Sequence, residues 1–250
     1  MKRALRALLP VLALAPAALV LSCFGGDEAP APTATPTATQ ATATPEPTPT
    51  PVDPGAVIRE SADRMESVER MHFRLNHENG ASEIVRGIMM VYAEGDIDGA
   101  HRMRAEIEGA LGTVKFETGV IILPEGSWIQ NPFDRSWESE EISIEEFFDP
   151  QDGVAALMRE VIDPVLDGHE EIDGVETYRI DVLADSGDLA VFPTATPGFE
   201  VRATLWIGVE DLLLYRVDVR GAISETESAD ILRRLELSRF GEDVDIAPPP

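Results

Sequence analysis

The residue best suited to covalent chemistry is the only cysteine of the 250-residue chain, Cys23, which ends the segment "ALVLSC". The thiolate is the reactive form of cysteine and attacks acyl donors, disulfides and metals. Because the sequence holds no second cysteine, an intramolecular disulfide is excluded. The remaining roles for Cys23 are lipid attachment, a free or intermolecular thiol, or simple packing in a core.

The residues before Cys23 favour lipid attachment. Three basic residues among the first six precede an almost wholly apolar run over 8–21, which two prolines interrupt. This order is typical of a secretory signal peptide, and the run falls short of the roughly 20 apolar residues of a transmembrane helix. The segment Val20-Leu21-Ser22-Cys23 resembles a bacterial lipobox. We therefore predict a signal peptide over 1–22 and a lipidated Cys23 on the outer face of the cell membrane.

A low-complexity segment follows the cysteine. Residues 27–55 are mostly Pro, Thr and Ala without apolar periodicity, a composition that cannot bury enough surface to fold and that favours extended polyproline II. At about 3.1 Å per residue the stretch would reach roughly 90 Å. The sequence thus predicts a disordered tether over 23–55 and one folded domain over 56–250.

The charge of the chain limits its partners. The sequence has 46 acidic and 20 Lys and Arg residues, a formal net charge of −26. Such a surface repels phosphate backbones, which argues against nucleic acid and against docking on a bare anionic lipid surface. A well-solvated surface is the simplest interpretation of this acidity.

Motifs of common enzymes and metal sites are absent from the sequence. No Gly-x-Ser-x-Gly elbow, phosphate-binding loop or dinucleotide fingerprint occurs, and the four histidines form no helical metal-binding pair. Glu94, Asp96 and Asp98 have the spacing of a calcium loop, but their flanks look like strands, so a charged hairpin turn is the better interpretation. We expect no catalytic residues, no cofactor and no metal.

The domain alternates between two hydrophobic periods. Helical spacing of Ile58, Ala62 and Met65 predicts an opening helix, and a second helix is expected over 153–165. Period-two alternation predicts short strands before and after that second helix, with strand candidates at 120–123 and 127–131 and a hairpin turn at Asp173-Gly174. The order is helix, meander, helices, meander.

This order predicts an α+β fold with a large antiparallel sheet. About nine or ten strands cannot stay flat, because strand twist curls a sheet of that width. The helices should pack on the concave face, with Met65, Leu157 and Val161 directed towards it. A curled sheet covered by few helices would form a half-barrel with an apolar cavity.

Three stretches resemble the LppX/LprAFG family of cell-envelope lipoproteins. They are "GHEEIDGVETYRIDV" at 168–182, "LWIGVEDLLLYRVDVRG" at 205–221 and "LELSRFGEDVDIAPP" at 235–249. The resemblance covers about 57–249 and implies a LolA/LolB-like half-barrel. It also implies that the interior binds acyl chains of envelope lipids or lipoglycans and carries them between membrane and envelope layers, with envelope transport proteins as possible partners.

Apolar and aromatic side chains of the expected helices and strands are the candidates for the cavity lining. They are Met65, Phe73, Leu75, Met103, Phe116, Trp128, Phe147, Phe148, Leu157, Val161, Tyr178, Ile180 and Leu205. Each could equally pack in an ordinary core. Two other functions stay open: a sensor or interaction module that binds a protein or lipoprotein segment in the same half-barrel, and an envelope hydrolase with converging carboxylates in a polar cleft.

Overall fold

The computed structural model describes residues 51–85, 88–142, 152–189 and 195–250, all within one compact unit over Pro49–Pro250. Its helices are α1 (Pro54–Glu66), α3 (Asp152–Glu160) and the short 3-10 helix η1 (Ser186–Asp188). Its strands are β1 (Arg70–Glu78), β2 (Ser82–Val85), β3 (Ile88–Asp98), β4 (Met103–Leu111), β5 (Val114–Leu123), β6 (Gly126–Gln130), β7 (Trp137–Ser139), β8 (Ile162–Ile172), β9 (Val175–Asp185), β10 (Glu200–Gly208), β11 (Leu214–Arg220) and β12 (Leu232–Ser238).

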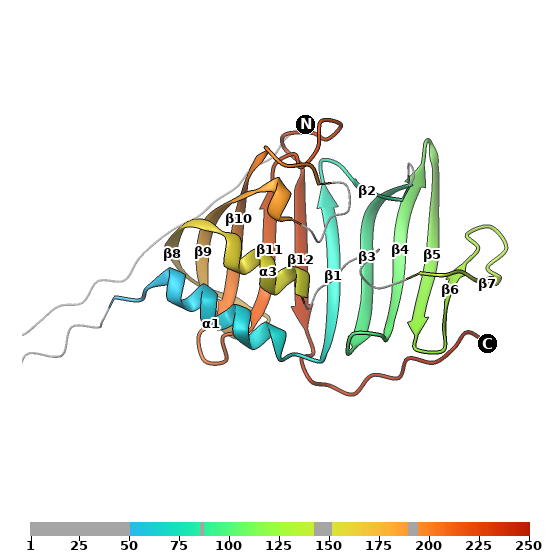
Figure 1. The fold of residues 1–250 in the computed structure, drawn as a ribbon, viewed down its shortest axis with the longest axis horizontal. Coiled ribbons are helices and arrows are strands. Elements are labelled where there is room, and N and C mark those ends of the chain that lie inside the picture. Colours follow the sequence, from blue (N-terminus) through green and yellow to red (C-terminus); the bar gives the residue numbers. More distant parts are fainter. Residues whose placement is uncertain (1–50, 86–87, 143–151, 190–194) are drawn as a thin grey trace, which may run out of the picture. The chain divides into compact units, whose positions relative to one another are not determined.

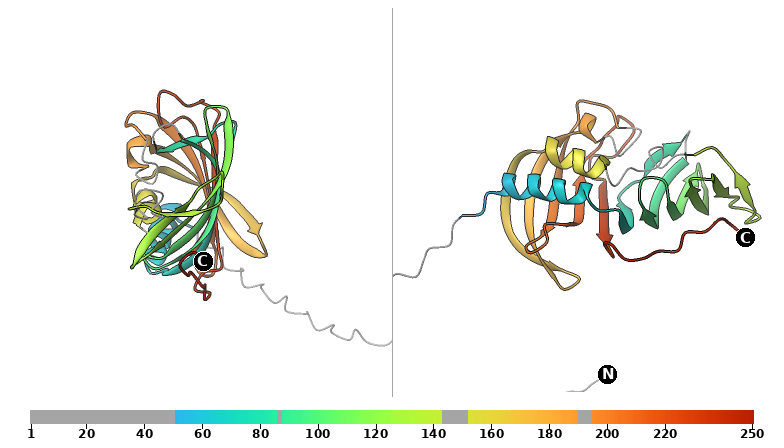
Figure 2. Two further views of the ribbon diagram at one scale, coloured as in Figure 1. Left: turned by 90° about the vertical axis from the view of Figure 1, so that its right-hand side faces the viewer. Right: turned by 60° about the horizontal axis from the view of Figure 1, so that its bottom comes forward.

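The strands form one antiparallel sheet of 12 strands in the order β7-β6-β5-β4-β3-β1-β12-β11-β10-β9-β8, with β2 paired to β3 beside this path (Figure 1). The strands β1–β7 form a first meander and the strands β8–β12 a second one. The pairing of β1 with β12 joins the two meanders edge to edge and places Leu75 opposite Leu235. The sheet is strongly curled but unclosed (Figure 2). The predicted α+β fold with a large curled antiparallel sheet is confirmed.

The helix α1 has clear start and stop signals. The Asp53 carboxylate caps the first turn by accepting a hydrogen bond from the Gly55 N–H at 3.0 Å, and Pro54 occupies a position where its missing N–H is harmless. The predicted apolar stripe is buried at Ile58, Ala62 and Met65. Through this stripe α1 packs beside α3, and the two helices lie across the strands β8–β12 (Figure 1).

Buried and exposed side chains alternate along the strands, so the two faces of the sheet differ in character. On β4, for example, Met103, Ala105 and Ile107 are buried, whereas Arg104 and Glu106 between them are exposed. The buried set of both meanders joins the apolar residues of α1 and α3 in a single hydrophobic cluster. We call the face that carries this cluster the inner face and the opposite one the outer face.

The predicted helix over 153–165 is wrong in its second half. The helix α3 ends at Glu160, and β8 begins at Ile162. Pro164 supplies no N–H and disfavours a helical residue before it, and Asp163 takes a φ of 50°. The pairing with β9 shifts register at this point, so the proline occupies a bulge of an edge strand, where it is tolerated.

Other elements differ in detail from the sequence prediction. Residues 120–123 are the end of the longer strand β5, and the candidate at 127–131 corresponds to β6. The Asp173-Gly174 hairpin between β8 and β9 is confirmed, with φ of 49° and 86°, as a two-residue turn of the primed type requires.

The C-terminal segment packs on the outer face of the first meander. Ile246 is buried against Ile121 and Leu123 of β5, and Trp128 and Trp137 complete this second, smaller cluster. The Arg102 guanidinium donates to the Ile246 carbonyl at 2.8 Å. The chain therefore returns from β12, in the second meander, to β5, in the first (Figure 1).

Candidate functional site

Seven of the residues predicted to line a cavity lie together in the inner-face cluster. Each is at most 5% exposed: Met65, Phe73, Leu75, Met103, Leu157, Ile180 and Leu205. They come from both helices and from strands β1, β4, β9 and β10. None of them lines the four hollows considered below. In this conformation they form a packed core.

The other predicted residues lie elsewhere or at the margin. Val161 and Tyr178 are partly buried and pack against the inner-face cluster. Trp128 belongs to the smaller cluster on the outer face. Phe116 lies beside a hollow of about 560 Å³ near the end of the first meander. Phe147 and Phe148, with the expected helical turn around them, lie outside the described residues.

Methionine is prominent in the inner-face cluster. Five side chains that are at most 5% exposed belong to it: Met65, Met71, Met90, Met103 and Met158. The Met65 sulfur also accepts a hydrogen bond from the Leu214 N–H at 3.4 Å, so α1 contacts the start of β11. Methionine is unbranched and polarizable and adapts to irregular space. This core can therefore repack more readily than one built from branched side chains.

An ion pair and a histidine are buried at one end of the inner face. Arg233 of β12 is paired with Glu227, donates from Nε to the Ser82 hydroxyl at 2.9 Å and from Nη1 to the Gly221 carbonyl at 3.0 Å. His77 contacts the same hydroxyl at 2.9 Å. Burial, reinforced by the Arg233 charge, lowers the pKa of His77 to about 4, so this imidazole is neutral at neutral pH.

Sequence reasoning missed this network, although a signal was present. In "ILRRLELS" the residues Arg233, Leu235 and Leu237 share one parity, so Arg233 must face the apolar side if the two leucines do. An arginine in that register needs a buried carboxylate, because an unpaired internal charge is strongly unfavourable.

The acidic stretch that resembled a calcium loop has another role. Glu94, Asp96 and Asp98 lie on the outer face of β3, directly opposite Arg74, His72 and Arg70 of β1. The resulting contacts include Arg70 Nε to Asp98 at 3.0 Å, His72 Nδ1 to Asp96 at 2.9 Å and His72 Nε2 to Glu94 at 3.0 Å. These carboxylates serve cross-strand pairs, and the turn itself begins only at Gly99. Among the described residues no cluster of His, Cys, Asp and Glu is arranged to hold a metal ion.

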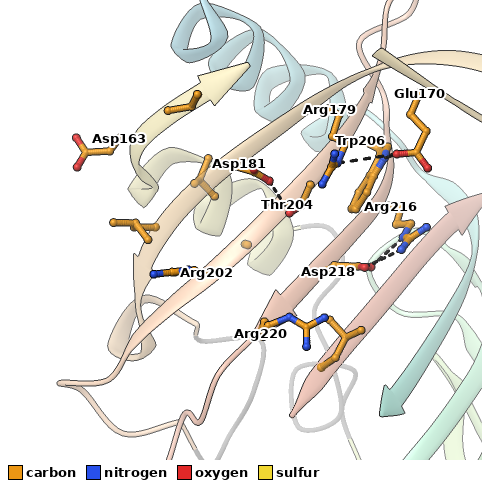
Figure 3. A pocket seen from close by; sticks show the side chains of 15 residues that line it. Asp163, Glu170, Arg179, Asp181, Arg202, Thr204, Trp206, Arg216, Asp218 and Arg220 are labelled. Atoms are coloured by element: carbon orange, nitrogen blue, oxygen red, sulfur yellow. Dashed lines mark hydrogen bonds and ion pairs between the residues drawn. The ribbon is translucent and has the colours of Figure 1, made fainter. Parts of the chain in front are cut away.

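The largest of these hollows lies on the outer face of the second meander. It measures about 760 Å³ and is lined by β8, β9, β10, β11 and the start of β12 (Figure 3). Trp206 lies within it, with the Arg216 guanidinium 4.3 Å from its ring centroid and its indole N–H donating to Glu170 at 2.8 Å. The Thr204 hydroxyl donates to Asp181 at 2.7 Å. This hollow, which we call the outer groove, is lined by both charged and apolar side chains and was not predicted.

Within the described ranges, no helix is both long and apolar enough to cross a membrane.

Two solved structures resemble this fold. LprF from Mycobacterium bovis aligns with a TM-score of 0.62 and 16% identity, over 78% of this chain and 96% of LprF. Lipoprotein LppX from Mycobacterium tuberculosis aligns with a TM-score of 0.56 and 20% identity, over 77% of this chain and 97% of LppX. At these identities the likeness establishes the fold.

Comparison at the level of sequence families gives a match over most of the chain. A search of curated proteins finds no match. The model of the LppX_LprAFG lipoprotein family matches residues 53–246, which include every helix and strand described above. The three stretches at 168–182, 205–221 and 235–249 lie within this range or extend just past its end, and the protein belongs to the LppX_LprAFG lipoprotein family.

Proposed function

We propose that this protein is a lipid-anchored lipoprotein that binds acyl chains of envelope lipids or lipoglycans against the inner face of its sheet. It carries these chains between the membrane and outer envelope layers. Cys23 holds the anchor, the segment between Cys23 and the start of α1 at Pro54 forms the tether, and the protein exchanges its cargo with envelope transport proteins. Membership of the LppX_LprAFG lipoprotein family supports a role as a lipoprotein that binds or carries lipid.

The methionine-rich inner-face cluster is the observation that carries the proposal. Methionines from α1, α3, β1, β3 and β4 belong to one apolar cluster, and the two helices that cover its part over β8–β12 have only 13 and 9 residues (Figure 1). An acyl chain gains about 25 cal/mol for each Å² of apolar surface removed from water. If α1 and α3 move outward, the same apolar side chains that now contact each other can contact the chain instead. The packed core is then the unloaded state of the site.

The ion pairs of Arg159 support movement of the two helices as a unit. This residue, near the end of α3, pairs with Asp63 at 2.9 Å and with Glu66, both on α1. These contacts join the helices to each other across an exposed surface. A carrier that opens by lifting its helical layer needs the helices to stay together.

Lipid analysis of the protein without its own anchor tests the proposal. The chain from residue 23 onward, with Cys23→Ser, is exported to a bacterial envelope behind a cleavable signal peptide and purified without detergent, and bound lipid is identified by mass spectrometry. We expect acyl lipid that copurifies and that a fluorescent long-chain fatty acid displaces. A protein that carries no lipid and does not bind the fatty acid would overturn the proposal.

A further inference from the structure

One row of residues across the outer groove places two arginines directly opposite each other. Arg202 of β10 pairs with Arg220 of β11 in the antiparallel register. The row continues to Leu183 of β9 beside Arg202 and to Leu232 of β12 beside Arg220. Directly opposed side chains in such a pair have Cβ atoms only about 4.5–5.5 Å apart, and like charges there destabilise the sheet.

Neither arginine has a carboxylate partner among the described residues, although the chain is strongly acidic. Both are exposed and line the outer groove, and no dashed line joins either of them to a neighbour in Figure 3. The next row of the groove differs. There Asp218 binds Arg216 at 2.6 Å and Arg234 at 2.8 Å, and Asp181 accepts from Thr204.

The surroundings of the arginine pair are partly apolar. Leu232 is 3% exposed and Leu183 is half-buried, and the row ends on the edge strand at the exposed Ile162. Val165, which also lines the groove, is exposed as well. Two adjacent cations bordered by aliphatic surface match a ligand with a compact double negative charge and an apolar portion.

We propose that the outer groove binds a phosphoryl group between Arg202 and Arg220. Guanidinium groups donate paired hydrogen bonds that fit phosphate oxygens, and a bound dianion would relieve the repulsion between the two charges. Such a group can come from free phosphate or from the headgroup of a phosphate monoester lipid. The proposal is independent of acyl-chain binding, because the groove lies on the face opposite the inner-face cluster.

Binding measurements with matched arginine variants test this site. The Cys23→Ser chain from residue 23 is titrated with inorganic phosphate in a calorimeter, and Arg202→Gln and Arg220→Gln are compared with Arg104→Gln. Arg104 is exposed on β4 and has no ion pair in the described part of the molecule. Losing one charge-assisted contact should weaken phosphate binding by about tenfold in the two groove variants and leave Arg104→Gln unchanged.

A second ligand pair distinguishes the two sources of phosphate. If dihexanoyl phosphatidic acid binds more tightly than inorganic phosphate and its binding depends equally on Arg202 and Arg220, the phosphoryl group belongs to a lipid headgroup. Equal affinity of the two identifies free phosphate. Dihexanoyl phosphatidylcholine, which has no monoester dianion, controls for binding of the acyl chains elsewhere.

Thermal unfolding gives an independent measurement. Without phosphate, Arg220→Gln should raise the Tm because it removes a like-charge contact, and it should reduce the rise in Tm that phosphate causes. Equal phosphate affinity in all variants, or a lower Tm of Arg220→Gln without phosphate, would overturn the site. The copurified acyl lipid should be the same in every variant, so failure here leaves the carrier proposal to its own test.

Discussion

Arg233 and Glu227 form an ion pair on the inner face of the sheet in which the two side chains are only 1% and 5% exposed. Arg233 also contacts Ser82 and the Gly221 carbonyl, and Glu227 accepts a hydrogen bond from the Ile223 N–H at 2.8 Å. The pair therefore ties the segment between β11 and β12 to β2. Ile223 of this segment is fully buried in the inner-face cluster.

Removal of one partner from this pair should strongly destabilise the protein. Arg233→Met leaves the Glu227 carboxylate buried and uncompensated, which costs about 3–5 kcal/mol. The control is Arg159→Met, which removes the exposed pairs with Asp63 and Glu66 and should change the free energy of unfolding by about 0–1 kcal/mol. Urea unfolding of both variants measures the difference. Similar values for the two would show that the buried pair contributes no more than a surface pair.

His77 should make the stability of the protein fall in mild acid. Its pKa is about 4 in the folded protein against an ordinary value of 6.5, so the unfolded chain binds the proton more readily. The stability from the neutral imidazole is complete above about pH 6.5 and is lost as the pH falls towards 4, by up to about 3 kcal/mol.

The measurement is the free energy of unfolding as a function of pH for the unmodified chain and for His77→Gln. The variant should lose less stability between neutral and mildly acidic pH. His101→Gln, in which an exposed histidine of the turn after β3 is removed, should retain the full pH dependence. An unchanged pH dependence in His77→Gln would contradict the assignment.

Leu157→Trp tests whether the inner-face cluster is the lipid site. Leu157 of α3 is 5% exposed and packs in the cluster, so a larger side chain should destabilise the lipid-free protein by about 1–3 kcal/mol. It should also reduce the copurified lipid of the folded protein, because the indole competes with the acyl chain. Val114→Trp, at an exposed hairpin position, should change neither. A folded Leu157→Trp protein with its full lipid content would place the lipid elsewhere.

Cys23→Ser should abolish membrane anchoring. Metabolic labelling with a fatty-acid analogue should mark the unmodified protein and leave the variant unlabelled and released from membranes. Cys23 lies outside the described residues, so the expectation rests on the basic head, the apolar run and the lipobox-like segment. Equal labelling of the two proteins would disprove it.

The sequence by itself determined the elements whose signals are local. Asp53, Pro54 and the spacing of Ile58, Ala62 and Met65 are enough to define α1, because capping and amphipathicity act within a few residues. Period-two alternation, as in Met103, Ala105 and Ile107 of β4, likewise shows which side chains of a strand share the buried face. The end of α3 was misplaced because its apolar spacing continues through Val161 and Val165, and only the pairing of β8 with β9 turns those residues into a strand.

Only the tertiary structure decided which strands pair and which side chains are neighbours on adjacent strands. The pairing of β1 with β12 joins residues more than 150 positions apart, and no local pattern encodes such a contact. The pairing register of neighbouring strands sets Arg202 opposite Arg220 and the acidic residues of β3 opposite β1, and the buried Arg233 contacts Ser82, 151 positions away. The sequence of each strand shows which of its side chains share a face. The neighbour that a side chain contacts across the sheet depends on which strands lie next to each other. Partner choice among twelve strands is a property of the whole sheet.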